Sequence, residues 1–190
     1  MLKLVLDPGH GGPDSGAVGT RTGLHECDVA LWTASRIESN LRDNPLVDVT
    51  LTHHGGGATL QERAHFANAI GADLFVSIHC NAHIGAGAHG FEVWTSPGRT
   101  AADLAATLIY NSIDNTFPEV WGRQDRVDDD PDKEARFYVL MHTLAPAVLV
   151  EMAFITNFSE EILLGTDVWR WRYADAITRG IETWITSGGL

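Results

Sequence analysis

The chain has 190 residues, of which 44% are hydrophobic and 20% are charged, as in an ordinary globular domain. Folding at this length buries about 70% of the surface that the unfolded chain exposes. The sequence has 13 Lys and Arg residues against 25 Asp and Glu residues, so its formal net charge is −12. This sign argues against nucleic acid as a partner, because proteins that bind phosphate backbones concentrate basic side chains. No apolar run approaches the ~18 residues of a membrane-spanning helix.

Short apolar runs alternate with amphipathic segments through the first half of the chain. The run over 2–7 predicts a strand, and a turn rich in glycine follows it. Thr59 and Glu62 stand three residues apart, which predicts a capping box at the start of a helix. The predicted elements of this half are strands over 2–7, 47–52 and 74–79, a helix that begins near residue 26, and a helix over 59–70.

The second half continues the same alternation of strands and helices. The predicted strands cover 91–95, 137–140 and 147–151, and the predicted helices lie around 104–113, from 157 and from 168. Strands that alternate with helices favour a single-domain α/β fold. We expect a mostly parallel, twisted sheet of about six strands, covered by helices on both faces.

One segment, over 125–134, has a biased composition with six acidic and two basic residues. Acidic runs of this kind are sometimes calcium-binding loops. Such a loop needs a glycine at its tight turn and a distal Glu at a fixed spacing, but Pro131 stands in this run. We therefore predict that the segment is a solvated surface loop and not a metal site.

Chelating side chains follow three of the predicted strands. His10, His79 and Glu151 stand at the ends of apolar runs, and Glu26 stands at the start of a predicted helix. Open α/β sheets bind their ligands at the ends of strands. A catalytic zinc needs three ligands drawn from His and carboxylate, together with a nearby base that is not a ligand. Two histidines and two glutamates meet this requirement.

The motifs around these residues resemble a known family. Their order and spacing are similar to those of the zinc-dependent N-acetylmuramoyl-L-alanine amidases, found among bacterial cell-wall remodelling enzymes and phage endolysins. The resemblance runs from Leu2 to about Gly180. The motifs that carry it are LDPGHGGPDSGAVG, the downstream Glu26, LQERAHFAN, SIHCNAH, GFEVW, FYVL and PAVLVEMAFITNFSEE.

The resemblance implies an activity and a role for each candidate residue. It implies one Zn²⁺ per chain, held by His10, Glu26 and His79, and a proton-transferring Glu151. The implied substrate is peptidoglycan, cut between the lactyl group of N-acetylmuramic acid and the L-alanine of the stem peptide. We expect a monomer whose residues 1–190 form one zinc amidase catalytic domain. The segment 125–134 is expected to flank the substrate groove.

Further residues near these motifs are assigned less specifically. Asp7 is a candidate for orienting a ligand histidine. Arg63 and Asn81 match family positions and are expected either to contact substrate or to support loops. His83 and His89 lie close enough to the SIHCNA loop to touch substrate. The run from Thr52 to Gly57 departs from the family pattern, which suggests a shortened or mobile loop.

Two other functions are compatible with parts of the pattern. One is a zinc peptidase that cuts within the stem peptide, and the other is a catalytically silent peptidoglycan-binding module. Glu151 argues against the silent module, because burying an unpaired charge costs several kcal/mol. His25 and Glu26 begin an HExxH-like run, but position 29 is Val, so a thermolysin-like helix is absent.

The beginning of the chain and its cysteines bear on where the protein works. A strand is predicted by Leu4, which leaves no room for a secretory signal. We expect a protein made in the cytoplasm that reaches the cell wall after release, as in phage lysis, or a mature secreted domain. Cys27 and Cys80 belong to no CxxC pair, so we expect two free thiols.

Overall fold

A computed structural model describes residues 1–85, 87–127 and 129–188 of the chain. Its centre is a six-stranded sheet with the strand order β2-β1-β3-β6-β4-β5. The strands are β1 (Leu2–Pro8), β2 (Val47–Leu51), β3 (Leu74–Asn81), β4 (Glu92–Thr95), β5 (Lys133–Glu134) and β6 (Ala147–Phe154). Every neighbouring pair is parallel except β4 and β6, which are antiparallel. The predicted mostly parallel α/β sheet is confirmed.

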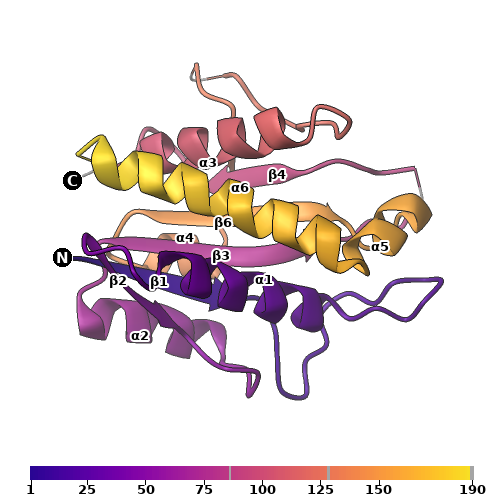
Figure 1. Ribbon diagram of the computed structural model, residues 1–190, viewed down its shortest axis with the longest axis horizontal. Coiled ribbons are helices and arrows are strands. Elements are labelled where there is room, and N and C mark those ends of the chain that lie inside the picture. The colour runs from indigo at the N-terminus through magenta and orange to yellow at the C-terminus, as the bar shows by residue number, and fades with distance from the viewer. Residues whose placement is uncertain (86, 128, 189–190) are drawn as a thin grey trace.

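Helices cover both faces of this sheet (Figure 1). The helices are α1 (Glu26–Leu41), α2 (Leu60–Ile70), α3 (Asp103–Thr116), α4 (Tyr138–His142), α5 (Phe158–Leu164) and α6 (Asp167–Thr186). In Figure 1, α1, α3 and α6 lie in front of the sheet, and α2 and α4 belong to its other side. The predicted capping box at Thr59 and Glu62 is present at the start of α2. None of the described helices combines the length and apolar character needed to cross a membrane.

Two apolar cores lie on opposite faces of the sheet. The larger core joins alternate residues of the central strands, such as Leu4 and Val76, to α1, α3 and α6. The smaller core contains Val5 and Phe75 and packs against α2 and α4. Successive side chains of a strand point to opposite faces, so a strand buried on both faces is apolar throughout. This explains the continuous apolar runs of β1 and β3.

One predicted strand is a helix. The run over 137–140 was expected to be a strand, but α4 covers Tyr138–His142. Val139 and Leu140 are buried in the smaller core beside α2. A short apolar run buries its side chains equally well as a strand or as one turn of helix, and its period does not separate the two. The sixth strand of the sheet is instead β5.

The acidic segment is only partly a surface loop. Its end forms β5, which pairs with Trp94 and Thr95 of β4. Asp132 is buried and accepts a hydrogen bond from the Thr95 hydroxyl at 2.6 Å. The prediction of a solvated loop is therefore wrong for the last residues of the segment. Asp128 lies outside the described residues.

Candidate metal and catalytic site

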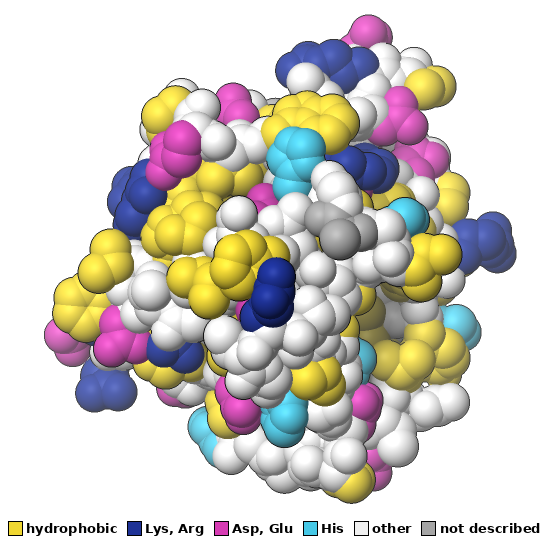
Figure 2. Space-filling view, turned by 90° about the vertical axis from the view of Figure 1, so that its right-hand side faces the viewer, with side chains coloured by type: hydrophobic (Ala, Val, Ile, Leu, Met, Phe, Trp, Pro, Cys, Tyr) yellow, Lys and Arg dark blue, Asp and Glu magenta, His cyan; other side chains and the backbone are white. Residues whose placement is uncertain are grey.

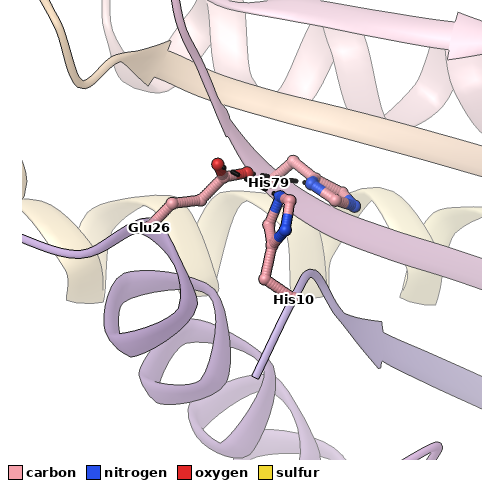
Figure 3. A group of neighbouring side chains, drawn as sticks. All are labelled: His10, Glu26 and His79. Carbon is pink, nitrogen blue, oxygen red and sulfur yellow. Dashed lines mark hydrogen bonds and ion pairs between the residues drawn. The ribbon is translucent and has the colours of Figure 1, made fainter. Parts of the chain in front are cut away.

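His10, Glu26 and His79 come together beyond the carboxyl ends of the central strands (Figure 3). His10 lies in the turn after β1, Glu26 is the first residue of α1, and His79 lies in β3. His10 Nε2 is 3.2 Å from Glu26 Oε2, and His79 Nδ1 is 2.9 Å from Glu26 Oε1. One carboxylate therefore faces both imidazole rings.

The backbone of the His10 turn is unusual. His10 has a positive φ of 60°, a conformation that non-glycine residues rarely adopt. This conformation lets the ring turn back toward Asp14, whose carboxylate lies 2.8 Å from His10 Nδ1. An imidazole that donates Nδ1–H to a carboxylate has its Nε2 lone pair free for a metal. That Nε2 is the atom that faces Glu26.

Glu26 is held in place by backbone groups. Its side chain is almost fully buried, with a relative exposure of 5%. The N–H of Ala17 donates to Oε2 at 2.9 Å, and the N–H of Cys80 donates to Oε1 at 3.1 Å. Each oxygen thus has one fixed backbone donor and one histidine neighbour. A carboxylate with two backbone donors loses little orientational freedom when it binds a cation.

Electrostatic interactions at this cluster favour positive charge. The hydrogen bond to Glu26 raises the pKa of His10 to about 9. Burial alone would lower the pKa of His79, but the hydrogen bond to Glu26 and the neighbouring carboxylates together outweigh it and raise that pKa. Burial alone would raise the pKa of Glu26, yet the two histidines hold it well below its usual range. A divalent cation bound here would replace protons that the cluster already retains.

The donor set fits a zinc ion. Two imidazoles and one carboxylate suit zinc, whereas calcium and magnesium prefer shells made of oxygen alone. Ligand atoms at zinc bond lengths in a tetrahedral arrangement lie about 3.3 Å apart. His10 Nε2 and Glu26 Oε2 already have nearly that separation. Ligand atoms from all three residues lie within 4.8 Å of one another.

Glu151 stands directly beside the cluster. It is the Cα partner of His79 across the parallel pair β3 and β6. Burial raises the pKa of Glu151 to about 7, so this carboxyl exchanges its proton near neutrality. Its Oε2 is buried and has no hydrogen-bond partner among the described residues. A buried carboxyl oxygen without a partner is costly in a purely structural role and suits a group that transfers protons.

A cleft of about 400 Å³ opens over these residues. His10, His79 and Glu151 lie at its base. Its apolar wall comes from Leu60 at the start of α2 and from the beginning of α4, and this wall includes Phe137. Figure 2 looks onto this end of the molecule, where histidine and apolar side chains gather on the surface. The cleft is therefore polar at its base and apolar along one side.

A buried ion pair between Asp7 and Arg63 supports the turn that contains His10. Asp7 accepts hydrogen bonds from Thr52 at 2.6 Å, Arg63 at 2.7 Å and Ser77 at 2.7 Å. The prediction that Asp7 orients a ligand histidine is not matched by a contact with either ring, since Asp14 contacts His10 instead. Arg63 also donates to the carbonyl groups of Pro8 and His10 at 2.5 Å each. The contacts of Arg63 are those of loop support.

Glycine pairs allow the His10 turn to approach the segment after β2. A Cβ on Gly12 would lie 2.3 Å from the carbonyl oxygen of Gly56, and one on Gly57 would lie 2.4 Å from that of Gly11. The two backbones are therefore in direct contact. His53, in the same segment, is buried and bonds to the carbonyl of Pro8 at 2.9 Å. The segment after β2 packs closely against the turn that contains His10.

Sequence reasoning missed several residues around the site. Asp14 is one of them, although its position four residues after His10 was a usable signal. Glu161 is another, and it is fully buried. It accepts the backbone N–H groups of Arg21 and Thr22, which ties α5 to the loop that leads into Glu26. Cys27 and Cys80 are both free thiols, as expected.

The remaining candidates are not among the residues that line the cleft. Asn81 donates to Glu92 at 2.8 Å, His83 is joined to Thr156, and the ring of His89 lies 5.4 Å from that of Trp121. His83 and His89 are both exposed. Substrate contact by these two histidines stays a prediction.

An α/β sheet with a His–Glu–His cluster and a buried carboxyl group at one edge has the arrangement of a metal-dependent hydrolase. A family model described as N-acetylmuramoyl-L-alanine amidase matches residues 4–183. The chain therefore belongs to this family, and it is an enzyme of that type, a peptidoglycan amidase.

The chain is similar to two amidases and to a phage endolysin. It is 34% identical to the N-acetylmuramoyl-L-alanine amidase AmiA of Escherichia coli, over 96% of this chain and 75% of that protein. It is 36% identical to the endolysin of Bacillus phage SPP1, over 95% of this chain and 65% of that protein. The solved catalytic domain of the amidase CwlV from Bacillus (Paenibacillus) polymyxa superposes with a TM-score of 0.87. That match has 30% identity and covers 98% of this chain and 99% of the other.

Replacing Arg63 by Lys should weaken metal binding while the fold is kept. A lysine retains the charge opposite Asp7, but it cannot also bond the carbonyl groups of Pro8 and His10. Groups that orient metal ligands typically contribute 10–100-fold in affinity, and we expect a loss of about that size. Competition with a chelator of known zinc affinity measures it. Arg42→Lys, at an exposed position after α1, is the matched control. Equal zinc affinity in the two variants would contradict the supporting role of Arg63.

Replacing Glu151 by Gln should stabilise the metal-free protein more at pH 8 than at pH 5. Because burial raises the pKa of Glu151 to about 7, the folded state favours the neutral acid, and the cost of the buried charge grows as pH rises toward and above 7. The increase in the free energy of unfolding should be about 1–3 kcal/mol larger at pH 8 than at pH 5. Urea unfolding with a chelator present measures it. Asp48→Asn, at an exposed site on β2, should show no such difference, and equal gains for Glu151→Gln at both pH values would refute the expectation.

Proposed function

We propose that this amidase uses one Zn²⁺ held by His10, Glu26 and His79, with Glu151 as its proton-transferring residue. The bond cut is the amide between the lactyl group of N-acetylmuramic acid and the L-alanine of the stem peptide. The observation that carries the proposal is the register of β3 and β6, which sets Glu151 opposite His79 and beside the His–Glu–His cluster. A metal-binding group and a base are thus adjacent at the floor of one cleft.

The metal and the protein supply different parts of the chemistry. A zinc ion at this position supplies a Lewis acid that polarises the scissile carbonyl and makes water acidic enough to be deprotonated near neutral pH. Glu151 takes the proton from the attacking water. Burial raises the pKa of Glu151 to about 7, so its carboxyl group can both accept and release a proton near neutral pH. Glu26 and the histidines keep their geometry through Asp14, Ala17 and Cys80.

Glu151 also has a role when the amide bond breaks. An amine leaves readily only after it has been protonated, and the proton that Glu151 has just accepted is at hand. The L-alanine nitrogen must then lie within hydrogen-bond reach of Glu151. The acyl side of the bond lies toward the metal cluster. This sets the direction of the substrate across the cleft, with the stem peptide on the Glu151 side.

The protein acts on the bacterial cell wall. Its relatives include a bacterial amidase and a phage endolysin, so either origin is consistent with the proposal. We propose that residues 1–190 form one zinc amidase catalytic domain and that this domain works as a monomer.

Digestion of purified peptidoglycan tests which bond is cut. The enzyme should release stem peptides with a free amino group on L-alanine and should leave glycan strands with unchanged reducing ends. Mass spectrometry of the products, together with an assay for new reducing sugars, measures both. Cuts within the stem peptide would assign the protein to the zinc peptidases instead. Intact walls after prolonged digestion by the zinc-loaded protein would favour a silent binding module.

Paired glutamate variants test the two proposed roles. Glu151→Gln should keep its zinc and its fold while turnover falls by about 10²–10⁴-fold, because glutamine cannot accept the proton. Glu26→Gln should lose zinc, because a neutral amide replaces the charged ligand. Zinc content and hydrolysis rate are measured on the same samples. If Glu151→Gln loses zinc and Glu26→Gln keeps it, the two roles must be exchanged.

A further inference from the structure

Two cations share one buried carboxylate next to Glu151. Glu92, the first residue of β4, is the Cα partner of Glu151 across the antiparallel pair β4 and β6, so both side chains are on the same face of the sheet. Arg123 Nε lies 2.6 Å from Glu92 Oε1, and Lys133 Nζ lies 3.0 Å from the same oxygen. Glu92 is only 3% exposed. A buried anion therefore holds both cations one strand away from Glu151.

The side chains of Arg123 and Lys133 have hydrogen-bond donors that Glu92 does not use. The other oxygen of Glu92 accepts a hydrogen bond from Asn81, so both cations share one oxygen. Arg123 donates only Nε to Glu92, and neither side chain has a further hydrogen bond among the described residues. Glu160 also lies near Arg123, but its two oxygens accept the backbone N–H groups of Gly90 and Phe154. Donors on both cations therefore remain available to an anion.

Both cations are accessible and fixed in position. Their side chains are 29% and 24% exposed. The guanidinium of Arg123 lies 5.0 Å from the ring of Trp121 and 5.3 Å from that of Phe154. Lys133 Nζ lies 4.5 Å from the ring of Trp94. Long side chains held between a carboxylate and aromatic rings lose little further entropy on binding an anion.

Lys133 is also connected with the apolar wall of the cleft through two aromatic rings. Phe137 lines the cleft, and its ring lies 5.5 Å from that of Trp94, on which Lys133 rests. Lys133 belongs to β5, at the end of the acidic segment. The expectation that this segment flanks the substrate groove is consistent with this position. Arg123 and Lys133 are two of only 13 basic residues in a chain with a net charge of −12.

The direction of the substrate connects these cations with the stem peptide. If Glu151 protonates the leaving L-alanine nitrogen, the peptide continues from Glu151 and away from the metal cluster. Glu92 lies one strand spacing farther on, which is about 5 Å. Consecutive residues of an extended peptide are separated by about 3.5 Å. The residue that follows L-alanine therefore lies within reach of Arg123 and Lys133.

We propose that Arg123 and Lys133 form a subsite for a free carboxylate on the residue that follows L-alanine in the stem peptide. This proposal rests on the proposed function, because the direction of the peptide is set by Glu151. Hydrogen bonds between two charged groups are stronger than those to a neutral group, so a free carboxylate should be clearly preferred over its neutral amide. The enzyme would then distinguish stem peptides by whether this carboxylate has been amidated.

Two matched substrates test the subsite in the zinc-loaded protein. They are soluble muropeptides of equal length that differ only after L-alanine, where one has a free carboxylate and the other a carboxamide. The wild type should have about a tenfold higher kcat/KM for the acid. Lys133→Gln and Arg123→Gln should each reduce this preference toward unity, chiefly through the acid substrate. Lys133→Arg should retain it, because a cation remains above Trp94.

The controls separate charge recognition from stability and from overall charge. Lys3, the only other lysine of the chain, lies at the start of β1 and is exposed. Lys3→Gln makes the same change in net charge and should leave the preference unchanged. Melting temperatures show whether each variant is folded under the assay conditions. Comparing both substrates in the same variant cancels any loss of active protein, so a partly unfolded variant still reports the ratio.

Several results would overturn the proposal. Equal kcat/KM for the two substrates in the wild type would show that the carboxylate is not recognised. A preference for the acid that persists in both Lys133→Gln and Arg123→Gln would place its recognition elsewhere. Failure of the proposed function gives a different result, since the wild type would then release no peptide with a free L-alanine amino group from either substrate.

Discussion

The Glu26 carboxylate is the group on which the arrangement of the site depends. It faces His10 with one oxygen and His79 with the other, and each oxygen also accepts one backbone N–H. Those N–H groups come from Ala17 in the loop before α1 and from Cys80 in β3. One side chain thus connects the first strand's turn, the first helix and the third strand. Movement of any of the three would change the geometry of the whole cluster.

The surroundings of Glu26 are organised by other buried carboxylates. Asp7 pairs with Arg63 under the His10 turn, and Glu161 accepts backbone donors from the loop that leads to α1. Buried ionised groups are costly unless every oxygen has a partner. Side chains supply the partners of Asp7, and backbone N–H groups supply most of those of Glu161. Such contacts contribute little to net stability, but they join separate elements of the fold.

The sheet and most helices could be predicted because their signals are local. Continuous apolar runs, the capping box at Thr59 and Glu62, and the breaks at glycine and proline each reflect a few neighbouring residues. The four candidate site residues were found because they stand in short motifs. Residues 137–140 were assigned wrongly because so short a run has no distinguishable period. The two residues of β5 are too few for any pattern.

The contacts that sequence reasoning missed around the candidate site depend on distant pairings or on an unusual backbone conformation. Arg123 and Lys133 meet Glu92 across separations of 31 and 41 residues, and nothing near them in the sequence indicates a shared partner. Asp14 is close to His10 in sequence, but its contact requires the left-handed backbone of His10. That conformation is imposed by Arg63 and the glycine contacts from outside the turn.

The antiparallel direction of β4 leaves a short connection after β3 where the chain could accept insertions. Because β4 is antiparallel to β6, residues 82–91 suffice to connect β3 with β4, and none of the described residues of this connection is helical. This connection is attached to the segment after β6 by bonds between His83 and Thr156 and between Asn157 and Ala88. Added residues here would enlarge the surface beyond the carboxyl end of β3, the strand that bears His79, and would leave both cores intact. Loop grafting at this position is therefore a route to altered substrate range that does not require the fold to be rebuilt.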